Sequence, residues 1–192
     1  MQYSPGQLKA ERAPRVGGRI PVAKGFLSSI QGAVAIEFAM VATPLIALLL
    51  VSLQTGIIFL ADQSLQTATQ NSARQLMTGS AQLAGGTQAQ FQSSVCNNVP
   101  SFFDCSKLMV DVQSSTSYTA VNTSSPIITY DGSGAVTNTW SYSPGNAGDI
   151  VIVRVMYNWP VFGGPLAVGL ANQPNGAALL VATVVLKNEP FS

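Results

Sequence analysis

The sequence contains no histidine and few charged residues. Only 9% of its 192 residues are Asp, Glu, Lys or Arg, whereas soluble domains carry about 25%. Without histidine, the commonest general base and metal ligand is missing. The motifs of P-loop nucleotide binding, serine hydrolases and zinc proteases are also absent. We therefore expect a protein that is not an enzyme and that binds no cofactor and no metal.

Basic residues are scarce and concentrated near the amino terminus. Residues 1–32 hold five basic residues against one acid, a net charge of +4, whereas the remainder has a net charge of −3. The basic stretch is rich in proline and glycine and lacks periodicity, so we predict an unstructured leader there. Its scattered arginines do not form a nucleic-acid-binding pattern. A basic flank before an apolar run places residues 1–32 in the cytoplasm.

A predominantly apolar stretch runs from Phe38 through Ala61, and none of its residues carries a charge. A helix of this length measures about 36 Å, and the hydrocarbon core of a bilayer about 30 Å. We predict a transmembrane helix at 33–61, in which Pro44 is tolerated as membrane helices tolerate proline. A rival interpretation is an ordinary signal peptide cut near 59–64. The run is too long for a signal peptide, and Glu37 lies at its edge.

The helical rhythm continues beyond the apolar run, over residues 62–83. Leu65, Ala68, Ser72, Leu76 and Leu83 fall near one face. Gly85 and Gly86 are typical of a helix end. We predict one helix from Ala33 to Ala84, about 75 Å long, whose second half packs on a sheet.

Strand patterns follow a short helix that starts near Thr87 and turns Phe91 and Val95 inward. We expect strands at residues 107–113, 127–130, 135–140, 149–159 and 178–188. The alanines of the last segment leave a short helix as the alternative, but its valines and threonine favour a strand. Alternation places Leu108, Val110 and Val112 on one face of the first strand, and Val151, Val153, Val155 and Tyr157 on one face of the fourth. The segment from Asp131 to Ala135 resembles a metal-binding loop only faintly, and a hairpin turn explains it.

The predicted fold class is α+β. A long amino-terminal transmembrane helix continues into a periplasmic helix packed on a small antiparallel β-sheet, as in pilins. The domains are a basic leader at 1–32, a transmembrane helix at 33–61 and a periplasmic α+β domain at 62–192.

The two cysteines, Cys96 and Cys105, both lie on the predicted outer side of the membrane. An even number of cysteines in an oxidising compartment indicates a disulfide, and the short loop between them is easily closed. Two unrelated thiols are the alternative.

The segment "GAVAIEFAMVATPLIALLL" (32–50) resembles the processing site and membrane helix of the TadE-like pseudopilins, from the tight-adherence branch of type IV pilus systems. That family has a glycine at the cleavage point, a glutamate at the fifth mature position and an aromatic residue next to it. The matching residues are Gly32, Glu37 and Phe38, with Ala33 as the new amino terminus. Further segments resemble segments of that family and occur in the same order along the chain. They are "QNSARQLMTG", the paired cysteines, "GDIVIVRVMYNWP" and the final "NEPF".

The resemblance implies a non-catalytic minor pseudopilin that takes part in assembling Tad/Flp-type pili and in surface adhesion. It implies a prepilin peptidase, other pseudopilins and pilin, the inner-membrane assembly platform and membrane lipid as partners, and no nucleic acid. The protein would be a single-pass protein of the bacterial inner membrane, with a cytoplasmic amino terminus and a periplasmic carboxyl-terminal domain. The rival interpretation is a membrane-anchored or secreted periplasmic protein with an unknown binding or enzymatic function.

Glu37 has a physical interpretation beside the resemblance. Cleavage after Gly32 would create an α-amine with a pKa near 8, largely protonated at neutral pH. Ala33 and Glu37 are four residues apart, on one helix face. A carboxylate inside lipid needs a partner, and a neighbouring subunit's amine would supply one and set the axial register between subunits. The alternative is a glutamate near the headgroups with no role.

Overall fold

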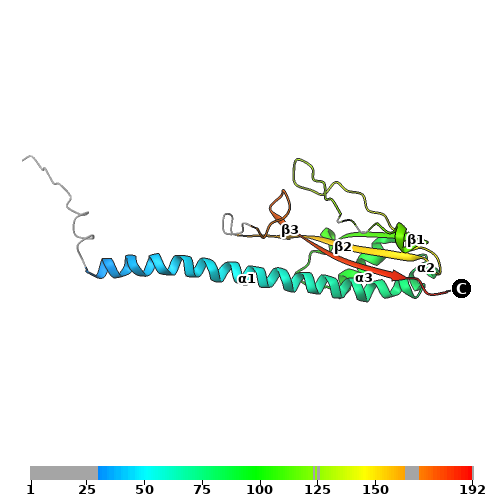
Figure 1. Ribbon diagram of the computed structural model, residues 1–192, viewed down its shortest axis with the longest axis horizontal. Coiled ribbons are helices and arrows are strands. Elements are labelled where there is room, and N and C mark those ends of the chain that lie inside the picture. Colours follow the sequence, from blue (N-terminus) through cyan, green and yellow to red (C-terminus); the bar gives the residue numbers. More distant parts are fainter. Residues whose placement is uncertain (1–29, 123, 125, 163–168, 192) are drawn as a thin grey trace, which may run out of the picture. The chain divides into compact units, whose positions relative to one another are not determined.

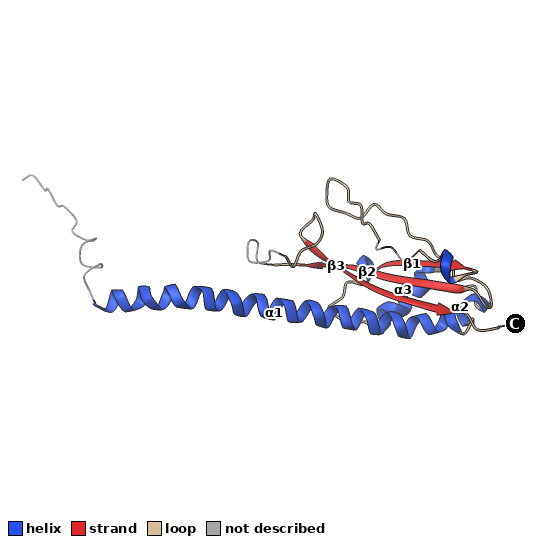
Figure 2. Cartoon of the chain, viewed as in Figure 1, coloured by secondary structure: helices blue, strands red, loops and turns tan. Residues whose placement is uncertain are grey.

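The computed structural model describes residues 30–122, 124, 126–162 and 169–191. The described part of the chain divides into two units after Ile46, and most of the predicted leader lies outside the described residues. The elements are α1 (Ile30–Met77), α2 (Ser80–Leu83), α3 (Gln88–Asn98), the 3-10 turns η1 (Cys105–Lys107) and η2 (Tyr118–Ala120), and the strands β1 (Met109–Ser115), β2 (Ile150–Pro160) and β3 (Ala177–Lys187) (Figure 1, Figure 2). One long apolar helix and a small sheet confirm the predicted α+β class.

Helix α1 ends earlier than the sequence pattern predicts. Pro44 lies inside it without ending it, but the helix stops at Met77 rather than Ala84. The cause is Gly79, whose φ of +74° is left-handed, a conformation that commonly ends helices and that glycine adopts without a steric penalty. The chain turns there, so Leu83 is 64% exposed and does not join the buried stripe.

The three strands form one antiparallel sheet in the order β1-β2-β3. β2 is central and pairs Val155 with Val110 on one side and Ala182 on the other. The strands predicted at 107–113, 149–159 and 178–188 are confirmed within about two residues at each end, the usual uncertainty of element boundaries. The two long strands, β2 and β3, have no charged residue in their centres except Arg154.

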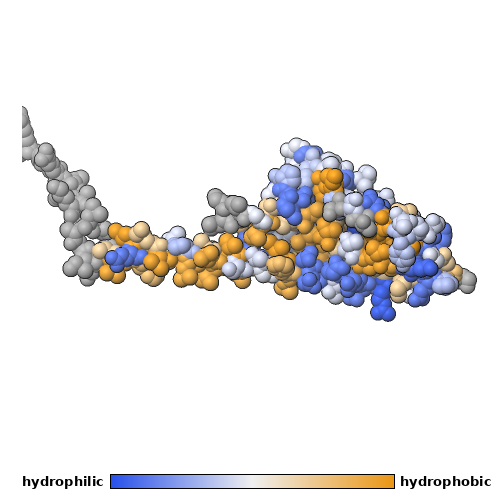
Figure 3. All heavy atoms as spheres, in the orientation of Figure 1, coloured by the Kyte–Doolittle hydropathy of each residue, from blue (hydrophilic) through white to orange (hydrophobic). Residues whose placement is uncertain are grey.

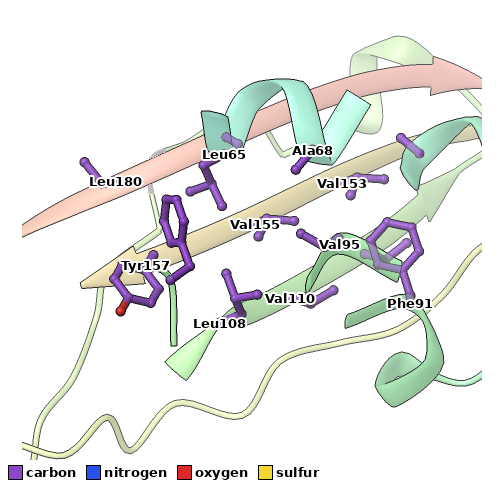
Figure 4. Packing of buried hydrophobic residues seen from close by; sticks show 14 of the residues in the cluster. Leu65, Ala68, Phe91, Val95, Leu108, Val110, Val153, Val155, Tyr157 and Leu180 are labelled. Atoms are coloured by element: carbon purple, nitrogen blue, oxygen red, sulfur yellow. The ribbon is translucent and has the colours of Figure 1, made fainter. Parts of the chain in front are cut away.

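One face of this sheet carries the main core (Figure 4). Leu65, Ala68 and Leu76 from α1 and Phe91 and Val95 from α3 are at most 3% exposed. They pack on the predicted inward side chains of the strands, which are Leu108, Val110, Val112, Val151, Val153, Val155 and Tyr157. Each large apolar side chain buried in this way contributes about 1.5–3 kcal/mol, so the second part of α1 and the sheet stabilise each other.

The predicted hairpin at 127–130 and 135–140 is wrong as a pair of strands. A single bridge joins Tyr130 and Val136. The turn itself is present, because the Asp131 carboxylate accepts hydrogen bonds from the Ser133 amide and hydroxyl at 2.8 and 2.7 Å. The flanking residues instead cover the second face of the sheet, where Ile128 packs with Met156. Tertiary packing therefore replaces the strand pairing that local patterning predicts.

Candidate processing and assembly site

The predicted site residues all lie on the first turns of α1. Gly32, Ala33, Glu37 and Phe38 are helical, since no glycine or proline interrupts the apolar sequence between Ala33 and Thr43. Ala33 and Glu37 are exposed, and Phe38 is 74% exposed. The four-residue spacing places Ala33 and Glu37 on one side of the helix, where another chain could reach both.

The helix surface around this site is apolar and uncovered. Within α1, residues 33–60 expose large side chains such as Met40 at 73%, Val41 at 69% and Leu48 at 67% (Figure 3). Contiguous apolar surface of this extent marks a membrane or protein contact. The structure, over its described residues, has one helix long and apolar enough to cross a membrane. This helix fits a single-pass membrane anchor.

The two threonine hydroxyls of the apolar segment are satisfied within the helix. The Thr43 hydroxyl donates to the Ala39 carbonyl at 2.7 Å, and the Thr55 hydroxyl donates to the Val51 carbonyl at 2.9 Å. Hydroxyls bonded in this way do not need water, so neither threonine opposes insertion into lipid. Glu37 differs, because a carboxylate only accepts hydrogen bonds and has no donor within an apolar helix surface.

A disulfide joins α3 to the turn η1, which precedes β1. Cys96 and Cys105 are bonded, with their Cα atoms 5.6 Å apart, which confirms the predicted pair. Asp104 caps the turn η1 by accepting from the Ser106 amide at 3.1 Å. Hydrogen bonds from the Ser106 hydroxyl and from Lys107 hold the pKa of Asp104 below its usual value. The bridge holds α3 close to the start of the sheet, where Val95 of α3 joins the main core.

The carboxyl-terminal residues tie the sheet to the end of α1, a contact that sequence patterns did not reveal. The Glu189 amide donates to the Met77 carbonyl at 2.8 Å, which satisfies a free carbonyl of the last helical turn. Asn188 is buried, and its amide donates to the Pro144 and Asn146 carbonyls at 2.9 and 3.0 Å. The Phe191 ring lies against Gly79. The final "NEPF" therefore has a structural role.

A buried ion pair is the second feature that the sequence analysis missed. Arg154 on β2 lies opposite Asp111 on β1, 3.5 Å apart, and both side chains are at most 6% exposed. Arg154 also donates to the Asn122 carbonyl, and Asp111 accepts from the Ser141 amide at 3.2 Å. The signal was available, since each residue is the one charge in the interior of its apolar strand pattern. The pair holds the loop between β1 and β2 over the second face of the sheet.

Comparison with known families finds a match to the amino-terminal part of the chain. Residues 32–74 match the family model described as TadE-like protein, which covers Gly32, Ala33, Glu37 and Phe38. No curated protein and no solved structure matches the chain. The match ends before the cysteines and the strands, so their resemblance to the family stays a prediction. From Gly32 through Arg74 the chain is therefore similar to TadE-like proteins, over the segment whose glycine, glutamate and phenylalanine carry the resemblance.

Proposed function

We propose that the protein is a membrane-anchored minor pseudopilin that takes part in the assembly of Tad/Flp-type pili and in surface adhesion, without catalytic activity. One observation carries this proposal. A single carboxylate, Glu37, lies on an exposed apolar helix surface within the segment that matches the TadE-like model. An acid in lipid costs about 2.5–3.5 kcal/mol at mid-helix on insertion scales, and less near the end of a helix, so a role in assembly explains its presence.

Processing supplies the partner of this carboxylate. A prepilin peptidase cuts after Gly32, where the missing side chain leaves the backbone accessible. The new amine on Ala33 is mostly protonated at neutral pH. In an assembly of parallel helices, the amine of one subunit pairs with Glu37 of its neighbour, and the pair is strong because lipid and protein exclude water. This contact sets the axial step between subunits.

The remaining partners and the location follow from this role. Other pseudopilins and pilin supply the neighbouring helices, and the inner-membrane assembly platform receives them. The protein is anchored in the bacterial inner membrane, with residues 1–32 in the cytoplasm and the carboxyl-terminal domain in the periplasm. The net charge of +4 on residues 1–32 supports this orientation. The absence of histidine from the chain supports a structural role.

The test is complementation of a deletion strain with site variants. Gly32→Leu should leave the chain full-length, because bulk at the cleavage point blocks the peptidase. Glu37→Leu should still be cut after Gly32 but should reduce surface piliation, because the neighbouring amine loses its partner at a cost of a few kcal/mol per contact. Glu37→Gln keeps the shape without the charge and should resemble Glu37→Leu. Immunoblots and amino-terminal sequencing score cleavage, and microscopy scores piliation.

Thr43→Val is the matched control. It removes another polar group from the same exposed helix surface, but one whose hydroxyl bonds within its own helix, so cleavage and piliation should stay at the wild-type level. Normal piliation with correctly inserted Glu37→Leu would refute the pairing role. An amino terminus at Met1 or Asp62 in cells with an active peptidase would refute processing.

A further inference from the structure

An aromatic cluster lies at the end of the sheet where β2 stops. Trp159 packs edge-on against Phe102 and Phe103, with ring centroids 5.8 and 5.7 Å apart. Tyr157 packs edge-on against Phe103 at 5.0 Å. Phe162 follows and is 73% exposed. In membrane proteins, Trp and Tyr gather at the boundary between lipid and water, because their rings are apolar and their edges are polar.

The same strand end forms a groove with α1. The groove has a volume of about 340 Å³, and residues 50–57 of the helix line one side while Trp159, Pro160 and Phe162 line the other. Its lining is apolar apart from Gln54. The Gln54 amide nitrogen is buried and has no hydrogen-bond partner among the described residues. A groove of this kind suits an apolar ligand.

The depth of these helix residues places the groove within the membrane. A hydrocarbon core of about 30 Å spans about 20 helical residues. Counted from Ala33 the core ends near residue 52, and counted from Phe38 it ends near residue 57. Leu50 and Val51 lie inside the core in both cases. Trp159 and Phe162, which share the groove with them, therefore lie at the level of the acyl chains or their boundary.

Charge is distributed along the sheet in the way that this depth requires. Between Arg154 and Lys187 the sequence contains no Asp, Glu, Lys or Arg, although connecting loops are normally polar. Asp149 and Lys187 lie at the opposite end of β2 and β3, where Ile150 pairs with Lys187. Asp104 and Lys107, which precede β1, pair with each other at 3.1 Å and are exposed. An ion pair such as this one suits the polar headgroup layer and not the acyl chains. Contact between the sheet end and the acyl chains is therefore confined to Trp159, Pro160 and Phe162.

We propose that Trp159, Pro160 and Phe162 form a second membrane contact, and that the groove between them and residues 50–57 holds an acyl chain of a membrane glycerolipid. The lipid belongs to the leaflet on the side of the carboxyl-terminal domain. The inference rests on α1 spanning the membrane and not on the role in pilus assembly.

The experiment uses the full chain in phosphatidylcholine vesicles, with bromine atoms on the acyl chains as quenchers of tryptophan fluorescence. The chain has two tryptophans, so Trp140→Phe leaves Trp159 as the reporter. Trp159→Phe leaves Trp140, half-buried on the other face of the sheet, as the matched control. We expect Trp159 to lose most of its emission in brominated vesicles and to emit at shorter wavelength. Trp140 should keep its emission.

A second pair of variants separates insertion from folding. Phe162→Asp places a charge on a side chain that is 73% exposed, and Ile127→Asp does the same at one that is 81% exposed. Both should fold. Phe162→Asp in the Trp140→Phe background should restore much of the Trp159 emission in brominated vesicles, whereas Ile127→Asp should not change it.

Three results would overturn the inference. In the first, Trp159 is quenched by aqueous iodide and not by brominated lipid, so the strand end lies in water. In the second, Trp159 is shielded from both quenchers and becomes accessible when the protein is diluted in lipid, so a second copy fills the groove. Both results leave the membrane anchor intact. In the third, the chain does not float with the vesicles, and the anchor and the inference fail together.

Discussion

The two parts of α1 have different surroundings although they belong to one helix. In residues 33–60 most of the large side chains are exposed, with Leu53 at 63% and Phe59 at 66%. In residues 61–77, Leu65 and Leu76 are completely buried. The first part is stable as a helix in lipid because its backbone groups bond within the segment. The second is helical in water because the sheet buries one of its faces. Local composition decides the first case and tertiary packing decides the second.

The largest expected effect comes from truncating a leucine in the buried part. Leu65→Ala should lower the free energy of unfolding of the carboxyl-terminal unit by about 2–5 kcal/mol, because it leaves a cavity under fully buried neighbours. Leu49→Ala, at a side chain that is 61% exposed, is the matched control and should leave this value unchanged. Denaturant unfolding in mild detergent, followed by near-ultraviolet circular dichroism, measures both. Equal losses for the two variants would mean that both parts share one environment.

The disulfide gives the next largest effect. Replacing Cys96 and Cys105 together by serine should cost about 2–3 kcal/mol, by loop-entropy models. Hydrogen exchange should increase in α3 and in residues 61–77 of α1, which pack on it, but not in residues 33–60. In protein taken from the cell envelope, alkylation before reduction should leave both cysteines unmodified in mass spectra. Two alkylated thiols in most molecules would contradict the bridge and the predicted location.

Two glycines give the smallest effect and the sharpest comparison. At Gly79, φ is +74° and a Cβ would overlap the Phe191 ring, so Gly79→Ala should cost about 1–2 kcal/mol through the left-handed backbone, with further loss from displacing Phe191. At Gly56 a Cβ meets nothing within 4 Å, so Gly56→Ala should be neutral or stabilise the helix by up to about 1 kcal/mol. Thermal unfolding in detergent compares the two. A destabilising Gly56→Ala would indicate that another chain packs there.

Much of the fold was predictable because its patterns are local. The alternation in β2 identifies Val151, Val153 and Val155 as one buried face, since successive side chains of a strand point to opposite sides. The predicted start of α3 near Thr87 is likewise local, because Thr87 and Gln90 form a capping box in which side chains and backbone amides bond reciprocally. The hairpin at 127–140 was mispredicted, because its alternation reflects packing on the second face of the sheet rather than strand pairing.

The sequence by itself determined the apolar helix, the position of Glu37 four residues after Ala33, the resemblance to TadE-like proteins and the strand faces. These follow from composition and spacing, which need no distant contact. Tertiary structure decided where α1 ends, which charges are buried and how the chain terminus is held. The chain turns at Gly79, against the Phe191 ring. The register of β1 and β2 places Asp111 opposite Arg154. The Asn188 amide donates to the Pro144 carbonyl. Each of these contacts joins residues far apart in the chain, so local patterns do not contain them.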